Sequence, residues 1–180
     1  MTEPQEPSVL VTGATGRLGG RVARRLAEQG VAQRLLTRNP ERAPELPGAT
    51  LVRGEYGDRE ALPRCLAGAR TVFMVSAPES AQRLAQHREF VDAAAKAGVA
   101  HLVYVSFFGA APDATFTLAR DHFHTEEHIR ASGMAYRSRQ VRGFLKAQNR
   151  ELAGHLGSGR RLCSRFEQQV LVRPTLGRVW

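Results

Sequence analysis

A glycine-rich turn that follows a short apolar strand is the feature that most restricts what this chain can fold into. Residues 9–11 are Val-Leu-Val and residues 12–19 read Thr-Gly-Ala-Thr-Gly-Arg-Leu-Gly, after which a helical pattern begins. A buried strand, a turn with a glycine at every third position and a helix together form the arrangement that binds the pyrophosphate of a dinucleotide. A turn with a purely structural role is the alternative. The complete context favours nucleotide binding.

The three glycines of this turn have separate physical roles. Gly13 permits a tight turn whose backbone angles a Cβ atom would oppose. Gly16 lets the backbone approach the phosphates, and Gly19 lets the helix pack closely on the strand. The helix adds unpaired N–H groups and the positive end of its dipole. We therefore expect these residues of the turn to bind the cofactor: Gly13, Thr15, Gly16, Arg17, Leu18 and Gly19.

Short apolar strands and helical segments alternate along the chain as far as about Tyr136. The pattern predicts further strands at residues 34–37, 50–53, 71–75 and 100–105, and helices at 17–29, 58–67, 80–97 and 116–131. Strands that alternate with helices require right-handed crossovers and a parallel sheet covered on both faces. The predicted fold class is therefore α/β, a Rossmann-like doubly wound parallel sheet, with residues 1–136 as an NAD(P)-binding Rossmann domain.

The positive charge of the chain is concentrated near its C-terminus. Residues 137–180 contain 10 basic and 2 acidic side chains, whereas residues 1–136 contain 16 and 15. Like charges at this density oppose compaction. We expect residues 137–180 to be a basic, loosely packed tail, with no strand core in 137–142 and with 170–172 docked on an exposed sheet edge. A basic tail binds anions without sequence preference, so it indicates no specific nucleic-acid partner.

The cysteines and the first residues bear on the cellular compartment. Cys65 and Cys163 are far apart in the sequence, which is typical of a protein from a reducing compartment. Cys65 lies in an apolar helical segment and is expected to be a buried thiol. The acidic, polar N-terminus is not a secretory signal, and no apolar run approaches the length of a membrane span. We expect a cytoplasmic protein without a membrane partner.

Several further segments occur in a fixed order along the chain. They are residues 13–19, 37–40, 53–58, 72–78, 97–106 and 122–133. In this order they resemble the NmrA-like atypical short-chain dehydrogenase/reductases, especially the NAD(P)H:quinone oxidoreductase-like branch. The resemblance implies an oxidoreductase that binds NADP(H) and transfers hydride to a quinone or similar small electrophile. The alternatives are a non-catalytic NADP redox-sensing regulatory protein and a truncated relative without activity. The oligomeric state is left open.

The resemblance weakens after Tyr136. Such relatives continue with an arginine-containing strand, a glutamate–asparagine pair and a lobe that covers the substrate. Here only residues 142–145 and Asn149 are similar to that continuation, and they are displaced. We expect a truncation or a change of reading frame near residue 137, and a substrate lobe that is largely missing.

Residues at the ends of the predicted strands supply the remaining cofactor contacts. Arg38 follows the second strand, where a cation accommodates the 2′-phosphate of NADP and a carboxylate would instead bind the 2′-hydroxyl of NAD. A solvated loop arginine is the alternative. Asp58 either accepts a hydrogen bond from the adenine amino group or caps the following helix. Ser76 and Ala77 end the fourth predicted strand at the ligand-binding edge of the sheet.

The catalytic group is not evident from the motif of the wider superfamily, a tyrosine with a lysine four residues later. None of the tyrosines Tyr56, Tyr104 and Tyr136 has a lysine at that spacing. The resemblance implies His122 as the catalytic residue, because related reductases have a lysine or histidine there. A histidine that titrates near neutral pH can donate a proton to a quinone oxygen. The alternative is a structural histidine at a helix end, bonded to a backbone carbonyl.

Residues 124–128 read His-Thr-Glu-Glu-His, which is the spacing of an inverted zinc-peptidase motif. No third ligand at a suitable position is evident in the sequence. A solvated, charged helix face explains these residues, and we predict no metal site.

Overall fold

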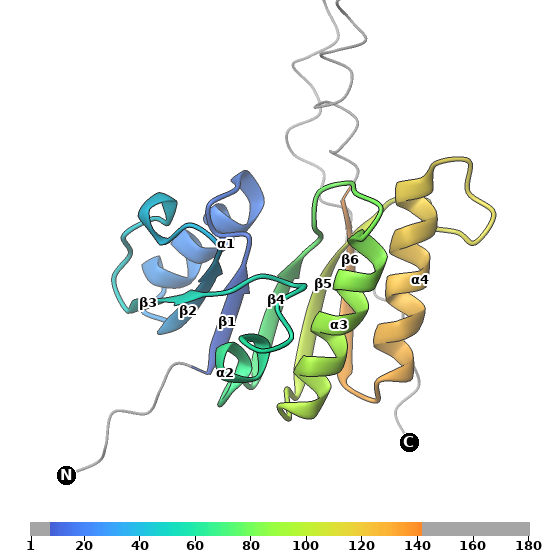
Figure 1. The fold of residues 1–180 in the computed structure, drawn as a ribbon. Coiled ribbons are helices and arrows are strands. Elements are labelled where there is room, and N and C mark those ends of the chain that lie inside the picture. Colours follow the sequence, from blue (N-terminus) through green and yellow to red (C-terminus); the bar gives the residue numbers. More distant parts are fainter. Residues whose placement is uncertain (1–7, 142–180) are drawn as a thin grey trace, which may run out of the picture.

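Residues 8–141, which the computed structural model describes, form a six-stranded parallel sheet with helices on both faces (Figure 1). The strand order is β3-β2-β1-β4-β5-β6. The strands are β1 (Val9–Thr12), β2 (Gln33–Thr37), β3 (Ala49–Arg53), β4 (Thr71–Val75), β5 (His101–Phe107) and β6 (Ala135–Val141). The helices are α1 (Arg17–Glu28), α2 (Leu62–Leu66), α3 (Arg83–Lys96) and α4 (Thr117–Ala131), with a 3-10 turn η1 (Pro40–Arg42). The predicted Rossmann-like doubly wound sheet is confirmed.

The order of the strands places a topological switch point between β1 and β4. The chain runs outward from β1 to β2 and β3, then returns to place β4 beside β1 and continues to β5 and β6. The connections on the two sides of this point diverge above the carboxyl ends of the strands. Ligands of open parallel sheets bind at that place.

The alternation of side chains along each strand divides the apolar core into two layers. Leu10 of β1 lies in the larger layer, which includes Phe90 of α3 and Ile129 of α4. The neighbouring Val11 points to the other face and packs with Ala23 of α1. Helices α2, α3 and α4 therefore cover one face and α1 covers the other (Figure 1).

The predicted helix over residues 58–67 is shorter in the structure. Asp58 and the residues after it form a turn in which the backbone N–H of Leu62 donates to the carbonyl of Asp58. Helix α2 begins only at Leu62. The predicted helix over 80–97 likewise begins at Arg83. These differences affect element boundaries, which local patterns define poorly because helix ends fray.

The prediction that residues 137–142 contain no strand core is wrong. Strand β6 pairs with β5 in parallel register, from His101 opposite Ala135 to Phe107 opposite Val141. An edge strand needs only one line of backbone hydrogen bonds and one covered side. Tyr136 packs against the larger core layer, whereas Arg137 is exposed. The arginines that argued against a strand are compatible with an edge, because alternate residues there face solvent.

Among the described residues, β6 and not β5 is therefore the edge strand on this side of the sheet. The division into a domain of residues 1–136 and a tail of residues 137–180 stays a prediction, although β6 crosses the expected boundary and extends to Val141. The expected docking of residues 170–172 lies outside the described residues.

Cys65 is buried in α2, as predicted, and its thiol contacts the backbone carbonyl of Arg53 at 3.4 Å. Burial raises the pKa of this thiol. Within residues 8–141, no helix combines the length and apolar character that crossing a membrane requires.

Candidate functional site

A cleft opens at the carboxyl ends of β1, β2 and β4, at the topological switch point. Five of the predicted site residues line it together: Gly13, Thr15, Arg38, Ser76 and Ala77. The cleft is completed by Thr12, Leu36, Thr37, Gly54, Glu55, Tyr56, Gly57, Val75, Pro78 and Gln86. The other predicted residues, Gly16, Arg17, Leu18, Gly19, Asp58 and His122, do not line the cleft.

The glycine turn has the geometry that its sequence predicts. Gly13 has a φ of 65°, and a Cβ atom there would lie 3.0 Å from Cβ of Val75. The N–H of Gly16 donates to the carbonyl of Gly13 at 2.9 Å and closes the turn. A Cβ atom on Gly19 would lie 2.6 Å from the carbonyl oxygen of Thr12. The backbone therefore occupies the space that side chains would take, and α1 approaches β1 closely.

The N-terminus of α1 faces this turn without a side-chain cap. Gly16 is the N-cap residue and Arg17 begins the helix, with no acidic residue in the first turn. The first N–H groups of a helix have no partner within the helix, and its dipole places partial positive charge there. The arrangement suits an anion, and phosphate is the common occupant of such turns. Arg17 and Leu18 contribute backbone N–H groups of this first turn.

Two hydroxyl groups join β1 to β4 where the backbone ladder between them stops. The last backbone pair is Val11 opposite Phe73. The N–H of Val75 then donates to Oγ1 of Thr12 at 2.8 Å. The hydroxyl of Tyr56 donates to the carbonyl of Val75 at 2.5 Å. Because this uses the only proton of the phenol, the Thr12 hydroxyl donates to the Tyr56 oxygen, also at 2.5 Å. Side-chain hydrogen bonds thus continue the link between the two strands at the cleft.

Burial raises the pKa of the Tyr56 phenol well above its ordinary value, so the group stays protonated near neutral pH. Neither Thr12 nor Tyr56 was predicted from the sequence as a site residue. A signal was available for Tyr56, because it lies inside the segment 53–58 that resembles the family.

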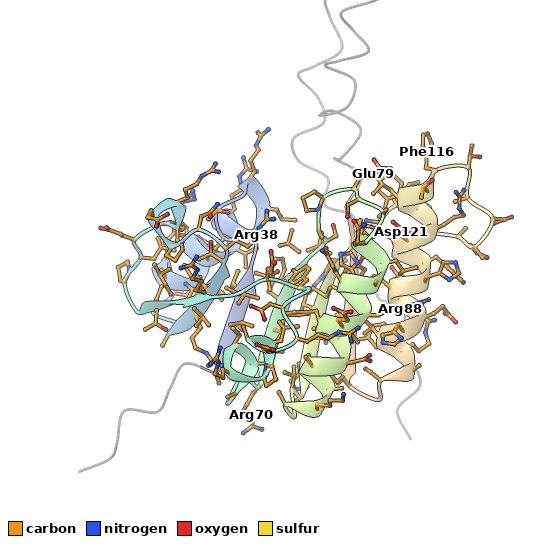
Figure 2. All side chains as sticks on the ribbon, in the orientation of Figure 1. Arg38, Arg70, Glu79, Arg88, Phe116 and Asp121 are labelled. Atoms are coloured by element: carbon orange, nitrogen blue, oxygen red, sulfur yellow. The ribbon has the colours of Figure 1, made fainter. Side chains whose placement is uncertain are left out.

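Arg38 lies on an exposed loop after β2 and lines the cleft. Figure 2 shows it at the carboxyl end of the sheet. Thr37 shapes this loop: its hydroxyl accepts from the N–H of Asn39 at 3.1 Å and donates to the Asn39 carbonyl at 3.2 Å. An exposed carboxylate, Glu55, lines the same cleft beyond the end of β3. The cleft therefore offers a cation and an anion from neighbouring strands.

Asp58 caps a turn and not the helix that was predicted to begin there, because α2 begins only at Leu62 and has no side-chain cap. Oδ1 of Asp58 accepts from the backbone N–H of Ala61 at 2.9 Å and caps the turn that leads into α2. The contact with an adenine amino group stays a prediction.

Ser76 and Ala77 form the wall of the cleft that follows β4. Both polar groups of the Ala77 backbone are bonded to side chains of α3. Its N–H donates to Nε2 of His87 at 2.9 Å, and its carbonyl accepts from Nε of Arg83 at 2.9 Å. The wall is thus fixed from beneath by a helix.

His122 lies in a buried cluster under this wall and is only 5% exposed. Arg83 donates to its Nε2 at 2.8 Å, so the ring proton is on Nδ1 and donates to the Tyr104 hydroxyl at 2.7 Å. The ring stacks on Phe107 with centroids 5.8 Å apart. Burial, and secondly the charge of Arg83, lower the pKa of His122 to about 3.

Two expectations for His122 are therefore wrong. It does not titrate near neutral pH, because desolvation disfavours the imidazolium. Its ring is bonded to the side chains of Arg83 and Tyr104, and not to a backbone carbonyl. A direct catalytic role for His122 stays a prediction, restricted to the neutral ring.

The His-Thr-Glu-Glu-His segment lies on α4. His128 contacts Asp92 of α3 at 2.7 Å, while Thr125 is fully buried against His87. In the part of the chain that the structure describes, no three His, Cys, Asp or Glu side chains are placed to hold a metal ion.

A comparison with protein families matches residues 5–149 to the NmrA-like family. The match continues past Tyr136, the residue after which the resemblance was expected to weaken. Among curated proteins, quinone oxidoreductase 2 of Escherichia coli is 36% identical over 132 residues, which are 71% of this chain and 46% of that protein. A (4-alkanoyl-5-oxo-2,5-dihydrofuran-3-yl)methyl phosphate reductase of Streptomyces griseus is 40% identical over 139 residues, 76% of this chain and 48% of that protein.

Among solved structures, the NADPH complex of the NADPH-dependent quinone oxidoreductase from Escherichia coli superposes with a TM-score of 0.69 at 31% identity. The match covers 82% of this chain and 54% of that one. The chain spans about half the length of the curated relatives it matches.

Proposed function

This chain belongs to the NmrA-like family, and from that premise we propose that it binds NADP(H) in the cleft at the carboxyl ends of β1, β2 and β4. We propose further that it is an oxidoreductase whose substrate is a quinone or a similar small electrophile. The observation that supports cofactor binding most strongly is the glycine turn. A Cβ atom would meet Val75 at Gly13 and the backbone of Thr12 at Gly19, so the turn keeps a bare, close-packed backbone directly before an uncapped helix N-terminus.

Each part of the cleft has an assigned task in this proposal. The turn from Gly13 to Gly16 and the backbone of Arg17 and Leu18 hold the pyrophosphate. Arg38 binds the 2′-phosphate, for which its guanidinium provides paired donors. Ser76 and Ala77 form the opposite wall. When bound, the cofactor supplies the hydride, and the protein supplies orientation and a shaped site.

The residues of the chain indicate the source of the proton for the substrate less directly than they indicate the cofactor site. His122 is the catalytic residue that the resemblance implies, and it stays part of the proposal. Its burial and its bonds to Arg83 and Tyr104 favour a role in holding the cleft wall over direct contact with a substrate.

The second candidate is a protein that binds NADP(H) and regulates a partner without turnover. It is favoured by the lack of a tyrosine–lysine pair among the described residues and by the burial of His122. Calorimetric titration with NADPH and NADH tests the binding, and NADPH oxidation with a panel of quinones separates the two candidates. Tight NADPH binding with quinone reduction supports the enzyme. Binding without oxidation supports the regulator, and no binding of either nucleotide contradicts both.

A cytoplasmic location is also part of the proposal, supported by the free, buried Cys65. We assign no specific nucleic-acid partner, because the excess positive charge is concentrated in residues 137–180, whereas residues 1–136 are nearly balanced in charge. Cell fractionation with an antibody to the chain tests the location.

A further inference from the structure

A cluster of polar side chains is buried between the carboxyl halves of β4 and β5 and the helices α3 and α4. Its members are Arg83, His87, Tyr104, Asp121, His122 and Thr125. Arg83 is 1% exposed, and His87, Tyr104 and Thr125 are fully buried. Burying such groups is unfavourable unless their hydrogen bonds are made. The cluster therefore requires an explanation beyond packing.

Arg83 and His87 both bond to the backbone of Ala77 in the cleft wall. Arg83 and His87 are four residues apart on α3 and so lie on one face of the helix. Arg83 donates from Nε to the carbonyl of Ala77, and His87 accepts from its N–H, both at 2.9 Å. Ala77 has only a methyl side chain with no polar group to bond, and the next residue, Pro78, has no N–H to donate. These two bonds are thus the means by which α3 holds the wall.

The hydrogen bonds of His87 define a single protonation pattern. Because a backbone N–H donates to its Nε2, the neutral ring has its proton on Nδ1. That proton is donated to Oγ1 of Thr125 at 3.1 Å, and the Thr125 hydroxyl donates to the carbonyl of Asp121 at 2.7 Å. His87 is therefore fixed on both sides.

The remaining nitrogens of Arg83 are also bonded within the cluster. One donates to Oδ2 of Asp121 at 3.2 Å and the other to Nε2 of His122 at 2.8 Å. His122 in turn donates to Tyr104. Asp121, on α4 in Figure 2, is the carboxylate that balances the buried guanidinium. Helix α4 and strand β5 thus orient the two side chains that hold Ala77.

We propose that Arg83 and His87 are positioning residues that set the affinity of the cleft for the cofactor by fixing the backbone of Ala77. This inference rests on the proposed function, because it assumes that the wall formed by Ser76 and Ala77 contacts NADP(H). It assigns a functional reason to a buried cation and two buried histidines, which the packing of an apolar core does not require.

Two substitutions of His87 separate this role from a purely structural one. The amide of glutamine reaches about as far as Nε2, so H87Q keeps an acceptor for the N–H of Ala77. The amide of asparagine reaches only as far as Nδ1, so H87N keeps the donor to Thr125 and loses the bond to Ala77. Both variants replace the ring with an uncharged amide and have no group that titrates near neutral pH. They form a matched pair.

We expect H87N to weaken NADPH binding about tenfold and H87Q less than about threefold, with similar falls in Tm. Calorimetry and thermal unfolding measure these values. Hydrogen exchange of the Ala77 amide, followed in the protein without cofactor, gives a second readout. It should accelerate in H87N and stay slow in H87Q.

Equal losses of affinity in the two variants, with equal exchange at Ala77, would overturn the positioning role. A wild-type protein that does not bind NADPH contradicts the proposed function, and the inference with it, before any variant is compared. If H87N does not fold, the variant R83K tests the same positioning role. Its amine keeps the charge but cannot reach Ala77, Asp121 and His122 together. We expect about a fivefold loss of NADPH affinity, and unchanged affinity would overturn the proposal.

Discussion

The two halves of the sheet build the cleft by different means. On the side of β1 and β2, the site is made from backbone: a glycine with positive φ, a close helix and an uncapped N-terminus. On the side of β4 and β5, the wall is held by buried side chains of Arg83, His87 and His122. The first half depends on the lack of side chains at a few adjacent glycines. The second depends on contacts between residues far apart in the chain.

This difference predicts how each half fails. A Cβ atom added to the backbone cradle removes the space that the ligand needs, so the effect on binding is large and local. A change in the buried cluster leaves the space open but releases the wall, so the effect on binding is smaller. Such a change also lowers the stability of the fold, because unpaired polar groups remain in the core.

The largest expected effect is that of Gly13→Val on cofactor binding. The φ of 65° is strained for a β-branched residue, and the added atoms meet Val75 at 3.0 Å. We expect NADPH affinity to fall more than about 100-fold, or about 2.7 kcal/mol. Calorimetry on the folded variant measures it.

Gly30→Val is the matched control for this substitution. Gly30 has a similar φ of 70°, but a Cβ atom there meets nothing within 4 Å. The control should lose about 1–2 kcal/mol of stability and keep its affinity. A Gly13→Val protein that folds and binds NADPH normally would place the phosphate site elsewhere.

The next effect concerns the choice of cofactor. Arg38→Asp removes a cation from the cleft and adds repulsion toward a 2′-phosphate, so NADPH should bind about 10–100-fold more weakly and NADH should become preferred. Fluorescence titration with both nucleotides tests this. Arg42→Asp changes the charge equally on η1, outside the cleft, and should leave the preference unchanged. Equal affinities of the unmodified protein for NADPH and NADH would refute the role of Arg38.

Acid should weaken the β4–β5 half selectively. Burial lowers the pKa of both His87 and His122 to about 3, against an ordinary value of 6.5. Between these values the unfolded chain binds protons that the folded protein does not. Stability is therefore complete above about pH 6.5 and is lost as the pH falls toward 3. Each histidine contributes up to about 1.4 kcal/mol per pH unit.

Urea unfolding at several pH values measures this slope. The neighbouring charges on the histidines are Arg83 of α3 and Asp121 of α4, and the Arg83 cation adds to the effect of burial. H87Q should reduce the slope by about half, whereas replacing the exposed His101 with glutamine should leave it nearly unchanged. A slope that H87Q does not alter would show that His87 is not a source of the acid sensitivity.

The comparison of the two halves also explains what the sequence could predict. The glycine turn was predictable because backbone conformation and close approach depend on residue type at adjacent positions. The strands β1 to β5 were predictable from their apolar runs. Arg38, Ser76 and Ala77 followed from their position at strand ends, and all three line the cleft.

The side-chain network was not predictable in the same way. His122 was identified by resemblance as a proton donor, but its surroundings come from α3, β5 and Phe107, whose packing no local pattern describes. Arg83 gave no signal, since an arginine in a helix is ordinarily solvated. Thr12 and Tyr56 meet across 44 residues of sequence. Strand β6 was missed because its arginines resemble a loop, although an edge strand tolerates them.

The smallest expected effect tests whether β6 belongs to the folded sheet. The hydroxyl of Ser138 donates to Oε1 of Glu126 on α4 at 2.6 Å, which ties the edge strand to the helix beneath it. Ser138→Ala removes this partly buried bond and should lower the free energy of unfolding by about 0.5–1.5 kcal/mol. Arg137→Ala, at the exposed neighbouring position, should change it by less than about 0.5 kcal/mol. Because stabilities of this size are resolved by urea unfolding, equal and negligible changes in both variants would show that β6 contributes little to the fold. A difference in the expected direction would show that the sheet extends through the segment that the sequence alone assigned to a tail.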